Sequence, residues 1–139
     1  MELRYFGQEL FEAAQKGPRA SNPIVVEARR RATTRARALI DGALAAHHLD
    51  AIVAPTNEPA WLTTLGQGDA FTGPSSSTPP AVSGYPSITV PAGFVGPLPI
   101  GISFLGARWS DGDLLSLAYS YEQTTHARRP PKLLATVGR

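Results

Sequence analysis

The sequence predicts an α/β fold, and three patterns carry that prediction. In residues 99–105, Ile100, Ile102 and Phe104 stand at every second position, which is the period of a β-strand. Residues 22–47 and 110–129 instead place apolar side chains every three or four positions, as an amphipathic helix does. The expected order of helix, helix, strand, long loop, two strands and helix gives an α/β layer arrangement.

The composition is that of one globular domain. The 139 residues are 42% hydrophobic and 17% charged, with 13 glycines and 13 prolines, below the level typical of disorder. A net charge of +2 is too small to indicate a nucleic-acid partner, and the lack of cysteine excludes disulfides and Cys-based metal sites. No apolar run reaches about 18 residues and the N-terminus is polar. We therefore expect the chain as given to be cytoplasmic, with no signal peptide and no membrane partner, while the compartment of a longer parent stays open. We also expect no cofactor.

Two helices are expected to open the chain. The first covers residues 1–15 and ends at Gly17 and Pro18. The second covers residues 22–47, with Asn22 as its N-cap and Pro23 in its first turn. The apolar positions of the first helix are Leu3, Phe6, Leu10 and Ala14, and those of the second are Val25, Ala28, Ala32, Leu39, Ala43 and Leu44.

Two clusters on the second helix suggest binding. The first cluster consists of five arginines, Arg29, Arg30, Arg31, Arg35 and Arg37. They indicate either an anionic partner or a solvated face with ion pairs to acids such as Glu27, and the near balance of acids and bases favours ion pairs. The adjacent His47 and His48 suggest a metal, but neighbouring helical residues point about 100° apart and no other ligand stands at suitable spacing. We expect no metal site there.

A short buried strand over residues 49–54 should end at Pro55. The loop of residues 56–73 is longer than most, which indicates a functional loop or one covered by a partner. A helical turn over residues 79–84 should precede strands at 87–92 and 99–105. About six residues should join these strands as a loose hairpin or a short excursion.

The last helix should begin at Ser110, with Asp113 completing a capping box, and end before Pro130 and Pro131. The strands and this helix are expected to share one core. Its predicted members are Ile52, Ile88, Val90, Ile100, Ile102 and Phe104 from the sheet and Leu114, Leu117, Ala118 and Tyr121 from the helix.

Several separated blocks resemble the C-terminal signature of the amidase signature hydrolases. They are AVSGYPSITVPAGF at residues 81–94, LPIGISFLG at 98–106, LDAIVAPT at 49–56 and the helix that closes with YEQ and ARRPP. RYFGQE at residues 4–9 and the APT and PAW segments are most similar to peptide amidases. The resemblance implies that residues 1–131 are the C-terminal part of an amidase signature domain, followed by a frayed tail over 132–139. It also implies a portion of that family's mixed sheet flanked by helices.

The same resemblance implies amide hydrolysis by a serine nucleophile, a second serine in a cis peptide and a buried lysine as base. Neither lysine of this chain lies in a buried strand, since Lys16 precedes Gly-Pro and Lys132 follows Pro-Pro. The serines at residues 75–77 resemble the nucleophile loop superficially, but they stand in the family's C-terminal segment and Pro74 lacks a backbone donor. No histidine and serine form a recognisable triad. We therefore expect no catalytic residue here and no activity from the chain alone.

What the resemblance leaves to this chain is a wall of the substrate pocket. The candidates are Asn57 and Trp61 in the loop after the first strand, and Ser87 and Thr89 at the start of the second. Ligands of α/β sheets bind beyond the carboxyl ends of strands, where Asn57 and Trp61 stand. Trp61 is equally compatible with a loop anchor packed on the sheet.

Three functions remain open from the sequence. The first is a portion of an amide hydrolase that converts carboxamides, such as peptide C-terminal amides, to a carboxylate and ammonia once a missing N-terminal portion joins it. The second is a non-catalytic remnant that binds proteins or self-associates through surfaces its lost half once covered. The third, a nucleic-acid binder using residues 29–37, lacks an aromatic or groove-reading element.

Overall fold

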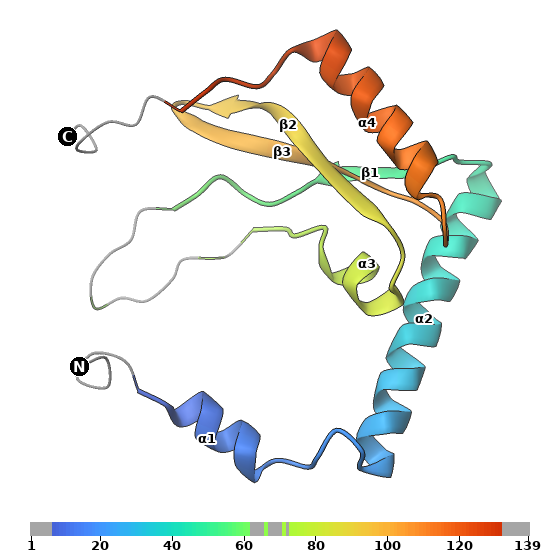
Figure 1. The fold of residues 1–139 in the computed structure, drawn as a ribbon, viewed down its shortest axis with the longest axis vertical. Coiled ribbons are helices and arrows are strands. Elements are labelled where there is room, and N and C mark those ends of the chain that lie inside the picture. The colour runs from blue at the N-terminus through green and yellow to red at the C-terminus, as the bar shows by residue number, and fades with distance from the viewer. Residues whose placement is uncertain (1–6, 62–65, 67–70, 72, 132–139) are drawn as a thin grey trace.

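The computed structural model describes residues 7–61, 66, 71 and 73–131. The chain forms α1 (Glu9–Lys16), α2 (Pro23–His47), β1 (Ile52–Pro55), α3 (Thr78–Ser83), β2 (Ser87–Val95), β3 (Leu98–Leu105) and α4 (Asp111–Thr125), as Figure 1 shows. The predicted α/β class and order of elements are confirmed. The first residues of the predicted opening helix and the predicted frayed tail lie outside the described residues.

The three strands form one antiparallel sheet in the order β1-β3-β2. The last two strands form a hairpin, which was one of the two predicted connections, but the predicted length of about six residues was wrong. Both strands run further than the apolar pattern indicated, and only Gly96 and Pro97 join them, with Gly96 at φ 59°. A register shift between Pro91 and Gly93 interrupts the pairing, as a β-bulge does.

Helix α4 lies on one face of the sheet (Figure 1) and makes the core with it. The buried core residues are Val90, Phe104, Leu114 and Ala118, and packed against them are Ala51, Ile88, Ile102 and Tyr121. Three core assignments were wrong. Leu117 is 36% exposed, Ile100 is half-buried, and Ile52 is half-buried on the other face because it pairs with Leu105 rather than Phe104.

Helices α2 and α3 pack together beside the opposite face. On α2, Ile40 and Leu44 are buried. Three residues that the apolar pattern placed inside are exposed, namely Ala28, Ala32 and Leu39. The guanidinium Nε of Arg37 donates to the carbonyl of Ser83 at 2.8 Å. This bond joins the end of α3 to α2, four residues before strand β2 begins.

The helix ends follow the sequence signals with two exceptions. Helix α4 ends at Thr125, where His126 turns left-handed, and does not continue to Pro130 as predicted. Asn22 caps α2 by accepting the backbone N–H of Ile24 at 2.9 Å. The capping box predicted at Ser110 is wrong, because its hydroxyl donates to the carbonyl of Ala107 at 2.8 Å and caps no N–H of α4. His48 ends α2 in a left-handed conformation, so it marks a helix boundary.

Candidate functional site

A cluster of three hydroxyls lies on the sheet face that α4 leaves free. We call Thr56, Thr89 and Ser103 the hydroxyl cluster. The Ser103 Oγ lies 2.8 Å from the Thr56 Oγ1 and 2.9 Å from the Thr89 Oγ1, and the two threonine oxygens are 3.4 Å apart. Pairing in the sheet brings them together, because Ser103 is opposite both Thr89 and Ala54, two residues before Thr56.

The chemistry of the hydroxyl cluster follows from counting its protons. Each hydroxyl has one proton to donate and two lone pairs, so three contacts in a ring use all three protons and leave lone pairs over. Ser103 is only 2% exposed, whereas Thr89 is exposed and Thr56 is half-buried. The cluster thus satisfies the buried Ser103 internally and presents acceptor oxygens of the two threonines to an incoming N–H group.

Gly101 makes room for this arrangement. A Cβ atom at residue 101 would lie 2.9 Å from the Thr56 Oγ1 and 2.9 Å from the Thr89 Cγ2. Such contacts are shorter than side chains tolerate, so the threonines can approach each other over Gly101 only because it has no side chain.

The serine loop before α3 is tied to the same place. The backbone N–H and the hydroxyl of Ser76 both donate to the carbonyl of Thr56, at 3.1 and 3.3 Å. The Ser75 and Ser77 hydroxyls lie 2.9 Å from each other. Among the described residues, the hydrogen bonds of these three side chains involve the loop itself and Thr56, and no basic side chain that would activate a nucleophile.

An apolar cavity of about 720 Å³ adjoins the cluster. Helix α2 forms one wall with the segment from Ala32 to Ile40, and β1, β3 and the α3 region form the others. The sheet and α3 contribute Ile52, Ala54, Leu105, Ser75, Ser76, Thr78, Pro79 and Val82. Among the described residues that line the cavity, Arg35 carries a charge. An apolar hollow beside a few convergent polar groups is the usual form of a small-molecule site.

The predicted site residues fall into two groups. Thr89 belongs to the hydroxyl cluster, and Ser87, two residues earlier on β2, is exposed on the same face. Asn57 and Trp61 follow β1, both exposed, and the Trp61 ring meets the Phe71 ring edge-on with centroids 5.7 Å apart. None of the four is among the described residues that line the apolar cavity. Sequence reasoning missed Thr56 and Ser103.

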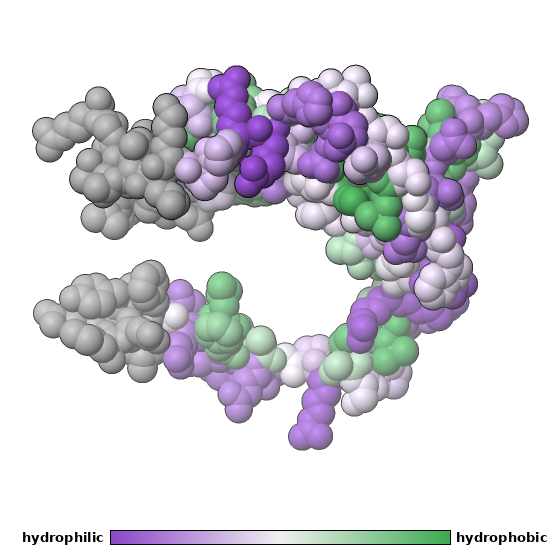
Figure 2. All heavy atoms as spheres, turned by 45° about the horizontal axis from the view of Figure 1, so that its top comes forward, coloured by the Kyte–Doolittle hydropathy of each residue, from purple (hydrophilic) through white to green (hydrophobic). Residues whose placement is uncertain are grey.

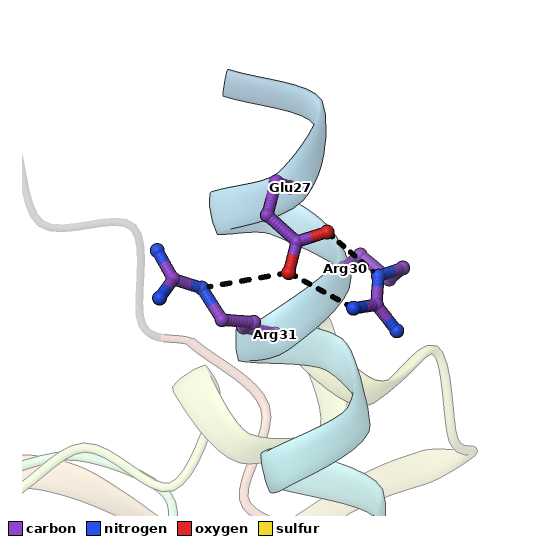
Figure 3. A network of polar contacts seen from close by, with 3 residues as sticks. All are labelled: Glu27, Arg30 and Arg31. Atoms are coloured by element: carbon purple, nitrogen blue, oxygen red, sulfur yellow. Dashed lines mark hydrogen bonds and ion pairs between the residues drawn. The ribbon is translucent and has the colours of Figure 1, made fainter. Parts of the chain in front are cut away.

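The arginine cluster of α2 is largely engaged within the chain. Figure 3 shows Glu27 between Arg30 and Arg31, with Arg30 donating twice at 2.8 and 2.9 Å and the Arg31 Nε at 3.8 Å. The hydrogen bond from Arg30 lowers the pKa of Glu27. Arg37 donates to the Ser83 carbonyl. The contacts of Arg30 and Arg31 with Glu27 are those that the ion-pair interpretation predicts for this face.

The described residues contain no group of three or more His, Cys, Asp or Glu side chains placed to hold a metal ion. No helix among them is long and apolar enough to cross a membrane.

Comparison with known proteins points to one group of hydrolases. The sequence matches no protein-family model. A probable amidase of Arabidopsis thaliana is 50% identical over 56 residues, which is 40% of this chain and 11% of that protein. A component of the glutamyl-tRNA(Gln) amidotransferase of Clostridium acetobutylicum is 32% identical over 131 residues, covering 86% of this chain and 26% of the relative.

Solved structures resemble this chain over nearly its whole length. The peptide amidase of Stenotrophomonas maltophilia has a TM-score of 0.81 and 47% identity, over 93% of this chain and 26% of that one. A bacterial aryl acylamidase of the amidase signature family, 22% identical, shares the fold with a TM-score of 0.59. This chain spans about a quarter or less of the length of these relatives. The chain thus belongs to the amidase signature family and corresponds to a C-terminal part of its members.

Proposed function

We propose that the chain is the C-terminal portion of an amide hydrolase whose catalytic serines and lysine come from an N-terminal portion. The reaction consumes one water, breaks the C–N bond of a carboxamide and releases a carboxylate and ammonia. The observation that carries the proposal is the 47% identity to a peptide amidase over 93% of this chain. It favours peptide C-terminal amides as substrates.

The chain's own lysines support the need for a second portion. A lysine acts as a base near neutral pH when burial disfavours its charged form. Lys16 is exposed in the last turn of α1, and Lys132 lies outside the described residues. Ser75, Ser76 and Ser77 bond within their loop and to Thr56, so they lack a described base.

In this proposal the chain supplies one wall of the substrate pocket. Ser87 and Thr89 contribute from the sheet face, and Asn57 and Trp61 from the loop after β1. The hydroxyl cluster offers acceptor oxygens, and an amide substrate offers N–H donors, so the two are complementary. The cluster would orient the amide while the N-terminal portion performs the attack on the carbonyl.

Complementation tests the proposal. The purified chain is mixed or co-expressed with the N-terminal portion of the related peptide amidase, and ammonia release from a peptide amide is measured. We expect activity from the mixture, with Thr89→Val raising KM and the matched control Thr124→Val on exposed α4 leaving it unchanged. A folded complex without ammonia release would exclude the amide hydrolase function.

A second candidate is a non-catalytic module that binds proteins or self-associates. The exposed side chains Leu10 and Phe11 of α1 and the open apolar cavity favour it. Relatives named as amidotransferase subunits also support a chain that works with a partner. This candidate predicts stable association without any gain of hydrolysis when an N-terminal amidase portion is added.

A further inference from the structure

Helix α1 carries an apolar face that the described chain leaves open. Leu10 is 80% exposed and Phe11 is 76% exposed, and α1 has no buried residue. Leu10 and Ala14 are four residues apart and therefore lie on one side of the helix, with Phe11 beside them. Figure 2 shows α1 standing apart from the sheet and its helices across an open space, with apolar atoms on its surface.

The apolar cavity between α2, α3 and the sheet is a concave surface that could accept the apolar face of α1. Its walls include Leu39 and Val82, which are 66% and 37% exposed although both are apolar. A short amphipathic helix that places neighbouring apolar residues into such a groove is a recurring mode of protein recognition. The chain therefore holds both halves of a helix-in-groove contact, and the part of the chain that the structure describes joins neither half to the other.

Helix α1 lies away from the cavity of its own chain, because none of its residues is among the described residues that line the cavity. Gly17 is extended, Pro18 follows it, and the N–H of Asn22 donates to the carbonyl of Arg19 at 2.9 Å before α2 begins. The cavity starts at Ala32, about 14 Å along the helix axis from Pro23 at 1.5 Å per residue. Figure 1 shows α1 leading away from that end of α2.

Charge also matches the two surfaces. The first turn of α1 carries Glu9 and Glu12. Arg35 is the charged residue among the described lining of the cavity. Opposite charges at the edge of an apolar contact guide orientation and disfavour wrong partners.

We propose that α1 of one copy binds in the apolar cavity of a second copy, with Leu10 and Phe11 as anchors and the acidic turn beside Arg35. Reciprocal exchange gives a two-fold dimer in which both helices and both cavities are used. The inference rests on the second candidate function, a module that self-associates, and concerns the chain alone. The complementation assay measures hydrolysis, whereas the test of this inference measures the mass of the chain alone. Either the hydrolase function or the dimer can therefore be excluded without the other.

The test is the mass of the purified chain by gel filtration with light scattering at micromolar concentration. We expect twice the 14.8 kDa of one chain. Phe11→Asp on the helix and Leu39→Asp in the cavity should each weaken the dimer about 30-fold or more, because each puts a charge at an anchor position. Both sites are exposed, so neither change should unfold the protein. Leu115→Asp, at a 60% exposed position of α4, is the matched control and should leave the dimer intact.

A charge exchange identifies the pair of surfaces. Arg35→Glu should weaken the dimer at least about tenfold through repulsion from the acidic turn, and Glu12→Lys added to it should restore most of the loss. A monodisperse monomer would overturn the proposal. So would a dimer that tolerates Phe11→Asp and Leu39→Asp, since another surface would then hold it together.

Discussion

The ring of Phe104 on β3 meets the ring of Tyr121 on α4 edge-on, with centroids 5.9 Å apart and an interplanar angle of 67°. Aromatic pairs favour this geometry, because the positive edge of one ring faces the negative face of the other. Phe104 is 8% exposed and belongs to the core cluster with Val90 and Leu114. The contact joins the sheet to the helix that covers it.

Phe104→Ala should therefore lower the free energy of unfolding by about 3–5 kcal/mol, the usual effect of emptying an aromatic core site. The measurement is denaturant unfolding followed by circular dichroism. Leu115→Ala on the exposed side of α4 is the control and should change stability by about 0.5 kcal/mol or less. A loss under about 1 kcal/mol for Phe104→Ala would mean that this face of the sheet is not the core.

Two glycine substitutions should act in opposite directions. Gly101→Ala should cost about 1–3 kcal/mol, because its Cβ would lie 2.9 Å from atoms of Thr56 and Thr89. Gly112→Ala in α4 should stabilise by about 0.4–1 kcal/mol, since its Cβ would meet nothing within 4 Å and alanine restricts the unfolded chain. Denaturant midpoints of the two variants give the comparison. Equal effects would show that the hydroxyl cluster does not depend on close approach over Gly101.

The face under α4 was largely predictable from the sequence, and the other face was not. The alternation of apolar residues along β3 places Ile102 and Phe104 on one side of the sheet. Helix α4 buries Leu114 and Ala118 against that side. Leu117 remains 36% exposed, because the contact with the sheet covers only part of the apolar stripe of the helix. The spacing of apolar residues shows which side of a helix faces the core, but it does not show how much of that side the sheet covers.

The hydroxyl cluster depends on sheet register. Thr56 is separated from Thr89 by 33 residues and from Ser103 by 47 residues, so only strand order and pairing bring them together. The one local signal was a polar Ser103 beside Gly101 at alternate positions of an otherwise apolar strand. Thr89 was predicted as a pocket residue from the resemblance. The same pairing links it to Ser103 and to Thr56, and no local pattern singles out Thr56.

Tyr85 provides a prediction about pH. Its hydroxyl donates to the Asp41 Oδ2 at 2.8 Å, and this hydrogen bond, followed by burial and the negative charge of Asp41, raises the pKa of Tyr85. The folded chain therefore holds the phenol proton more tightly than the unfolded chain. Its contribution to stability is complete below about pH 10 and is lost as pH rises through the raised pKa.

Titration of tyrosinate absorbance measures this effect. The difference between the wild type and Tyr85→Phe isolates the Tyr85 transition, which we expect above that of an ordinary tyrosine. Asp41→Asn removes the charge and should move the transition down. A Tyr85 transition at the ordinary value, unchanged in Asp41→Asn, would mean that the bond between α2 and the start of β2 does not form in solution.

The isolated chain should release no ammonia from peptide amides or simple aromatic amides. Catalysis by this family's chemistry needs a neutral lysine beside a serine, and Lys16 is exposed in α1 while the serine loop bonds to itself and to Thr56. The measurement is ammonia release at high protein concentration, with Ser75→Ala, Ser76→Ala and Ser77→Ala as variants. Background release should be the same in all four proteins. Turnover that disappears in any one variant would instead identify the loop as a nucleophile, and the requirement for an N-terminal portion would then be wrong.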